Sequence, residues 1–141
     1  MKKILLWLSC IFILAACSSE GGTSDEEPIL TKEYIEEKAK IGLTYDEVRE
    51  VFGTEDLSDV VDSTETWLYD STHHSDYEYD QSLEVIASEE IKTGKLDYQL
   101  YLNFMDEKVF MYAFFYKGED GKVWQYQLTP QNEPLTTPVS N

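Results

Sequence analysis

Apolar and polar residues alternate strictly over residues 96–104. Every second position in that stretch is apolar, at Leu96, Tyr98, Leu100, Leu102 and Phe104. This period of two predicts a β-strand with one face in a core, and it places on the other face Asp97, Gln99, Tyr101 and Asn103. Short polar turns separate this strand from two further predicted strands, 109–116 and 123–128. Residues 109–116 are apolar or aromatic on both faces, which is typical of a central strand.

Two helices are predicted before the strands. Thr31 starts a short helix whose apolar side chains are Tyr34, Ile35 and Ala39. The second helix has a capping box, with Thr44 as the N-cap and Glu47 three residues later. Its apolar residues recur at helical spacing, at Leu43, Val48, Val51 and Phe52. Gly53 is placed to end this helix in the left-handed conformation.

The segment 77–91 fits two patterns. Its apolar residues alternate as in a strand at Leu83, Val85 and Ala87, and they also fit a helix at Leu83, Ile86, Ala87 and Ile91. We favour a strand, because Thr93-Gly94 supplies a hairpin turn before the next strand. With a short aromatic strand at 65–69, the predicted fold class is α+β. Two N-terminal helices pack on one face of an antiparallel β-meander sheet of about four to five strands.

The N-terminus resembles a bacterial lipoprotein signal. Two lysines precede a short apolar run, and the tetrad Leu14-Ala15-Ala16-Cys17 resembles the lipobox that signal peptidase II reads. The run is too short to cross a bilayer core comfortably, since that takes roughly 20 residues. We therefore predict cleavage between Ala16 and Cys17 and attachment of diacylglycerol to Cys17. The alternative is an ordinary secretory signal with a chance cysteine.

These patterns divide the chain into four parts. Residues 1–16 are the predicted signal peptide, and 17–30 are the lipidated cysteine with a flexible acidic tether. Residues 31–128 form the α+β domain. Residues 129–141 contain three prolines, which predict an extended tail. For this tail, plain disorder and a docking strand are the alternatives.

Charge narrows the choice of partners. The chain has 28 Asp and Glu against 11 Lys and Arg, and loss of Lys2 and Lys3 with the signal leaves nine basic residues and a formal charge of −19. Such a surface repels phosphates, so no nucleic acid is expected as a partner. The expected membrane contact is the acylated Cys17. Cys10 leaves with the signal, so the folded part has no thiol, and neither a disulfide nor a cysteine zinc site is expected.

No catalytic or metal motif stands out. His73 and His74 are adjacent on an acidic loop, where neighbouring side chains point apart, so we interpret them as solvated histidines and predict no metal site. No nucleophile motif or phosphate-binding loop is present. We therefore expect neither an enzyme nor a cofactor.

Tyrosines are the best candidates for a binding surface. Two alternating sets of side chains occupy the two faces of the strand 109–116. The mainly aliphatic set suits packing against the helices; its members are Val109, Met111, Ala113 and Phe115. This choice leaves the aromatic set on the open face beside Tyr101; its members are Phe110, Tyr112, Phe114 and Tyr116. Tyrosine is enriched at the hot spots of protein interfaces. The sequence thus predicts a partner-binding face at Tyr101, Tyr112, Tyr116 and Tyr126. The alternative is that a further element covers these side chains.

Residues 41–53, Trp67-Leu68-Tyr69 and 102–109 carry a family resemblance. Together they resemble the SmpA/OmlA/BamE-like lipoproteins and the related β-lactamase-inhibitor-protein-like domains. The resemblance implies a two-helix, antiparallel-sheet module that binds proteins, with the sheet face opposite the helices as the clamp in the inhibitor relatives. Two features depart from the pattern: no proline follows Gly53, and the insertion at 70–91 is long.

The expected function follows from location and resemblance together. We expect a membrane-anchored extracytoplasmic lipoprotein that acts as a protein-binding module and has a protein partner in the cell envelope. The signal and tether favour the outer face of the plasma membrane of a Gram-positive cell. The alternatives are an immunity, exclusion or inhibitor lipoprotein, and a solute- or ion-binding lipoprotein.

Overall fold

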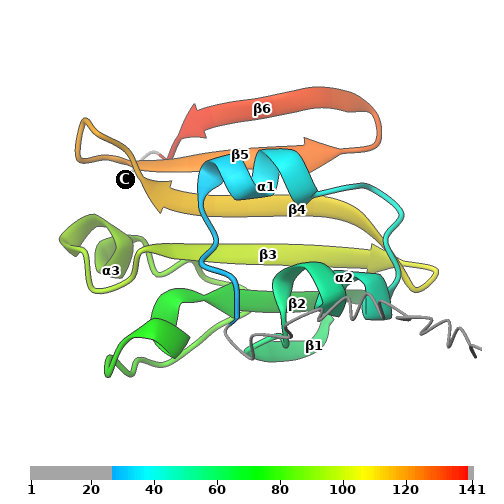
Figure 1. The fold of residues 1–141 in the computed structure, drawn as a ribbon, viewed down its shortest axis with the longest axis horizontal. Helices are drawn as coiled ribbons and strands as arrows, with labels where there is room; N and C mark the ends of the chain where they lie inside the picture. Colours follow the sequence, from blue (N-terminus) through cyan, green and yellow to red (C-terminus); the bar gives the residue numbers. More distant parts are fainter. Residues whose placement is uncertain (1–26, 140–141) are drawn as a thin grey trace, which may run out of the picture.

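A six-stranded antiparallel sheet forms the centre of the molecule (Figure 1). The computed structural model describes residues 27–139, and in that range each strand pairs with its neighbours in chain order. The strands are β1 Leu57–Val61, β2 Thr64–Asp70, β3 Tyr98–Met105, β4 Lys108–Lys117, β5 Val123–Thr129 and β6 Asn132–Pro138. Tight turns with positive φ at Asp62-Ser63 and Asp106-Glu107 join β1 to β2 and β3 to β4, as two-residue hairpins require.

The helices of the described range are short. They are α1 Lys32–Lys38, α2 Tyr45–Phe52 and α3 Ser88–Thr93, with a 3-10 turn at Ser71–His74. The capping box predicted for α2 is present, because Thr44 accepts from the Glu47 amide and the Glu47 carboxylate accepts from the Thr44 amide at 2.8 Å. Gly53, at φ 85°, follows the end of α2. None of the helices in residues 27–139 has the length and apolar character that crossing a membrane requires.

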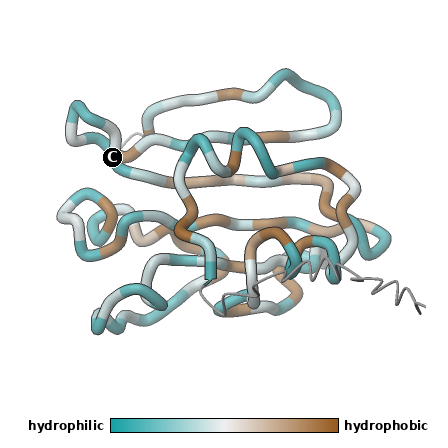
Figure 2. Tube along the Cα trace, in the orientation of Figure 1, coloured by the Kyte–Doolittle hydropathy of each residue, from teal (hydrophilic) through white to brown (hydrophobic). Residues whose placement is uncertain are grey.

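The sheet has two covered faces. Helices α1 and α2 lie over what we call the helix face, in front of the strands in Figure 1, where Ile35, Val48 and Phe52 pack against the sheet. On the opposite side, which we call the loop face, residues 77–87 and α3 cover a second, smaller core around Leu68 and Ile91. Hydrophilic residues gather on the connections between strands (Figure 2).

The predicted fold class is wrong in its strand count and in its account of the helices. The sheet has six strands rather than four to five, and α3 packs on the face opposite α1 and α2, so two N-terminal helices on one face do not describe the fold. The unpredicted strands are the two edges. Strand β1 has apolar residues at Leu57, Val60 and Val61 and exposed residues in its centre, so it lacks the alternation of a half-buried strand. Strand β6 contains Pro134 and Pro138, which an edge strand tolerates because one of its sides pairs with nothing.

The strand favoured for residues 77–91 is also wrong. Residues 77–87 are irregular, and Ser88–Thr93 form α3. Gly94 has a left-handed conformation at φ 77°, and its amide and those of the next two residues return to the carbonyls of Glu90 and Ile91. Thr93-Gly94 is therefore the end of a helix rather than a hairpin turn.

The predicted boundaries meet the described range only in part. Residues 1–16, Cys17 and most of the predicted tether lie outside the described residues. Leu30, the last residue of the predicted tether, is buried in the main core. The sheet continues through β6 beyond residue 128, into the stretch predicted as a tail.

Candidate functional site

The four tyrosines predicted as a binding face do not lie together on an exposed surface. Tyr112 and Tyr126 are on the helix face with 0 % and 4 % of their surface exposed, whereas Tyr101 is on the loop face with 7 % exposed. Tyr116 is partly buried at the edge of the main core. The prediction of an open tyrosine face is therefore wrong.

The size of the helices explains this correction. A helix of seven or eight residues is only about 10–12 Å long, so α1 and α2 leave a broad part of the helix face to be filled by large rings. Tyr112 fills part of it and donates its hydroxyl to the Lys40 carbonyl at 2.8 Å. The smaller Ala113 instead lies on the loop face.

Tyr101 has a positioning role on the loop face. Its hydroxyl lies 2.9 Å from the Ser82 carbonyl and 3.3 Å from the Val85 carbonyl, so it holds the turn between them against the sheet. The Ser82 hydroxyl accepts from the amides of Glu84 and Val85, both at 3.1 Å, which closes the turn. Burial raises the pKa of Tyr101 to about 12, so the hydroxyl stays a donor at neutral pH.

Between this turn and the sheet lies a hollow of about 330 Å³, which we call the loop-face groove. Its floor comes from β2, β3 and β4, through Thr66, Tyr101, Asn103, Met111, Ala113 and Phe115. One wall is formed by residues 83–86 and the other by the β1–β2 hairpin. The carboxylates of Asp62 and Glu84 stand on these walls, so the groove combines a mostly apolar floor with an acidic rim.

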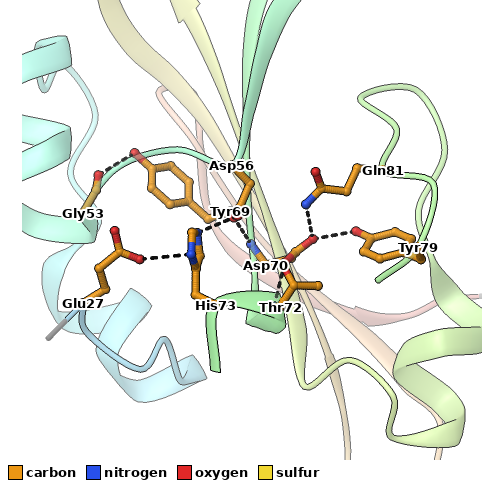
Figure 3. Close-up of polar contacts among 9 residues, drawn as sticks. All are labelled: Glu27, Gly53, Asp56, Tyr69, Asp70, Thr72, His73, Tyr79 and Gln81. Atoms are coloured by element: carbon orange, nitrogen blue, oxygen red, sulfur yellow. Dashed lines mark hydrogen bonds and ion pairs between the residues drawn. The ribbon is translucent and has the colours of Figure 1, made fainter. Parts of the chain in front are cut away.

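The segment that forms the first wall is tied down by Asp70, a buried carboxylate with 1 % of its surface exposed. Figure 3 shows its contacts: one oxygen accepts from Tyr79 at 2.7 Å and from Gln81 at 2.9 Å, and the other accepts from the Thr72 amide at 2.8 Å. Gln99 extends the network, because it donates to the Tyr79 hydroxyl at 2.6 Å and accepts from the Ala87 amide at 2.8 Å. We call these residues the Asp70 network.

A carboxylate–histidine pair lies beside this network (Figure 3). His73 Nε2 is 2.6 Å from Asp56 Oδ1, and His73 Nδ1 is 3.6 Å from Glu27 Oε2. Burial raises the pKa of Asp56 to about 6; the nearby charges of Asp70 and Glu27 add to this, while the Asp70 amide and His73 oppose it. Both His73 and His74 are exposed, as the sequence predicts, but His73 also contacts the Asp56 carboxylate, which the sequence did not indicate.

The described residues contain no cluster of side chains that could bind a metal ion. Among residues 27–139, no three or more histidine, cysteine, aspartate or glutamate side chains are grouped so that they could hold a metal ion. The predicted lipidation and cleavage positions, Cys17 and Ala16, lie outside this range.

Sequence reasoning missed the groove and the Asp70 network. The alternation over 96–104 places Gln99 and Tyr101 on one face correctly, but it assigns that face to solvent. The available clue was Gln99, a polar residue between the apolar Tyr98 and Leu100 that is fully buried and needs partners. Those partners lie 12 and 20 residues away in an irregular segment, which periodicity does not reveal.

The groove is the candidate functional site, because it combines an open volume, an apolar floor and charged groups on its rim. The Asp70 network and Tyr101 fix one of its walls. Comparisons of this chain with protein-family models, with curated proteins and with solved structures found no match.

Proposed function

We propose that this protein is a membrane-anchored extracytoplasmic lipoprotein that binds another protein of the cell envelope through the loop-face groove. The observation that supports this most directly is the groove itself, on the sheet face opposite α1 and α2. A hollow of about 330 Å³ is near the lower limit of small-molecule pockets, and it suits one or two anchoring side chains of a partner. The proposal includes neither a catalytic reaction nor a cofactor.

The lipid anchor is the second part of the proposal. The lipobox-like tetrad ends at Cys17, and nine residues separate this cysteine from Glu27, where the described structure begins. Ten chain steps reach at most about 35 Å, so the domain would stay close to the membrane surface. We place it on the outer face of a Gram-positive plasma membrane, as the signal sequence favours.

The resemblance to the SmpA/BamE-like and inhibitor-like lipoproteins supports the same reading. In the inhibitor relatives, the sheet face opposite the helices clamps the partner, and the loop-face groove lies on the corresponding side of this sheet. Membership of that family is part of the proposal. Whether the module is a scaffold or an inhibitor depends on whether the partner loses activity when it is bound.

Site-specific photocrosslinking on intact cells tests the binding site. A photoreactive residue in place of Met111, on the groove floor, should capture another envelope protein that mass spectrometry identifies. The matched control is the same residue in place of the exposed Glu119, in the turn after β4. Equal capture from both positions, or from neither, would contradict the proposed site.

Fractionation tests the anchor separately. Cys17→Ser should stop lipid attachment and release the protein from the membrane fraction. If the variant is processed and sediments with membranes as the unchanged protein does, the lipoprotein assignment is wrong.

A further inference from the structure

The acidic rim of the groove extends into a neighbouring hollow. This second hollow, of about 370 Å³, lies between β1 and residues 81–84, and it is also lined by Asp62 and Glu84, with Asp59 in addition. Within the described part of the chain, the residues that line the two hollows include no lysine, arginine or histidine. Asp59, Asp62 and Glu84 therefore line the two hollows, and no basic residue of the range 27–139 lines them.

These carboxylates are also free of ion pairs. Among residues 27–139, the ion pairs are made by other acids, such as Glu36 with Lys32 and Glu55 with Arg49. Asp59 accepts a hydrogen bond from the Val60 amide at 2.7 Å, which leaves its charge uncompensated. The chain as a whole has a formal charge of −17, so no general excess of basic residues screens the rim.

The floor and the rim together select a kind of side chain. Lysine and arginine have an apolar stem of several methylenes and a cationic head, so they bury the stem on apolar surface while the head stays with carboxylates. In the groove, Leu83, Ile86 and Met111 offer the apolar surface, and Asp62 and Glu84 offer the carboxylates. An acidic or phosphorylated partner would meet uncompensated like charge, which opposes binding.

We infer that the groove receives a lysine or arginine from a basic segment of the partner protein, with the stem on the apolar floor and the cation at Asp62 and Glu84. The inference names the partner chemistry of the proposed site and therefore rests on the proposed function. A second copy of this chain is a poorer occupant, because its net charge is strongly negative. Electrostatic attraction of this kind also raises the rate of association and weakens as salt increases.

The test uses the full-length protein with the photoreactive residue at Met111 on intact cells, combined with the double variant Asp62→Asn/Glu84→Gln. Both changes remove charge and keep shape. Asn is well suited to the positive φ of 50° at position 62, and Glu84 is exposed, so folding should be unaffected. The matched control is Asp76→Asn/Glu78→Gln, which removes the same charge from an exposed loop outside both groove linings.

The double variant should lower the yield of the adduct about three- to tenfold, because each ion pair between the partner's cation and Asp62 or Glu84 raises the affinity by up to about fivefold. The control should leave the yield unchanged. Higher salt should reduce capture by the unchanged protein, and the crosslinked partner peptide should contain lysine or arginine near the site of attachment.

Three results would overturn the inference, and they separate it from the proposed function. If the adduct forms equally well with the double variant, the partner chemistry is wrong while the binding site stands. If the crosslinked peptide lacks a basic residue, or comes from a second copy of this chain, the inference also fails. If Met111 captures nothing more than Glu119 does, the proposed function itself fails.

Discussion

Asp70→Asn tests whether a buried charge holds the wall of the groove. Asp70 accepts from Tyr79, Gln81 and two donors of Thr72, and it is almost fully buried. An asparagine has the same shape, but one of its two positions is an amide that donates rather than accepts. One oxygen of Asp70 accepts from the amide and hydroxyl of Thr72, and the other accepts from Tyr79 and Gln81. In either orientation of the asparagine amide, one of these two pairs of donors loses its acceptor.

The expected loss can be estimated from these contacts. Hydrogen bonds to a charged group contribute about 1.5–3 kcal/mol each, and partial rearrangement of Gln81 should recover some of this, so we expect a loss of about 2–4 kcal/mol. That is a large part of the ~5–15 kcal/mol by which a typical domain is stable. It corresponds to a fall in Tm of roughly 10–20 °C.

Urea unfolding at pH 7, followed by tryptophan fluorescence, measures the change in the free energy of unfolding. Hydrogen exchange gives the location: amides of residues 79–87 should exchange faster, because the network that fixes them is weakened. Asp76→Asn, in the exposed loop nearby, is the control and should change stability by less than about 0.5 kcal/mol. A stability of Asp70→Asn equal to that of the control, with unchanged exchange in 79–87, would refute the reasoning.

Three further predictions concern single side chains. Asp56→Asn should become more stable relative to the unchanged protein as pH rises from 4 to 7. The pKa of Asp56 is raised to about 6, so in the unchanged protein the stability that its protonated carboxyl contributes is fully present below pH 4 and is lost as the carboxyl ionises through pH 6, whereas the asparagine of the variant does not ionise. Urea unfolding across this pH range measures the difference. Tyr101→Phe should cost about 1 kcal/mol and speed hydrogen exchange in residues 82–87, because the hydroxyl that holds the turn is gone. Thr44→Ala should lower stability by about 1 kcal/mol through loss of the N-cap of α2, measured by thermal unfolding.

Each of these has an outcome that contradicts it. A difference between Asp56→Asn and the unchanged protein that does not vary with pH would show that the pKa of Asp56 is not raised. Tyr112→Phe is the control for Tyr101→Phe, because it removes a hydroxyl hydrogen bond on the helix face. Equal exchange in residues 82–87 for these two variants would rule out the positioning role of Tyr101. Full stability of Thr44→Ala would mean that α2 does not depend on its capping box.

Local signals predicted the parts of the fold that local energetics determine. The capping box at Thr44 and the glycine at position 53 place α2 correctly, because both act within one turn of the helix. The alternation over 96–104 predicts β3, and the turn at Asp106-Glu107 is present. The edges of the sheet were missed, because β1 has three exposed residues in its centre and β6 combines two prolines with exposed side chains.

The candidate site could not be predicted in the same way, because it depends on contacts between distant residues. The sequence does not say which face of β4 packs under the helices. In the structure the aromatic face of β4 packs under the helices, because α1 and α2 are short and leave room for the rings of Tyr112 and Phe114. The groove wall depends on Tyr101 and the Asp70 network, which join residues 9 to 20 positions apart in an irregular segment.

Both outer strands have features that discourage pairing with another chain. In β6, Pro134 and Pro138 lack the amide hydrogen that an incoming strand would need, and in β1 the Val60 amide is already bonded to the Asp59 side chain. Molecules confined to a membrane plane meet far more often than molecules diluted in three dimensions. For the membrane-anchored protein that we propose, blocked edges would allow a high surface density without joining one sheet to another in aggregates.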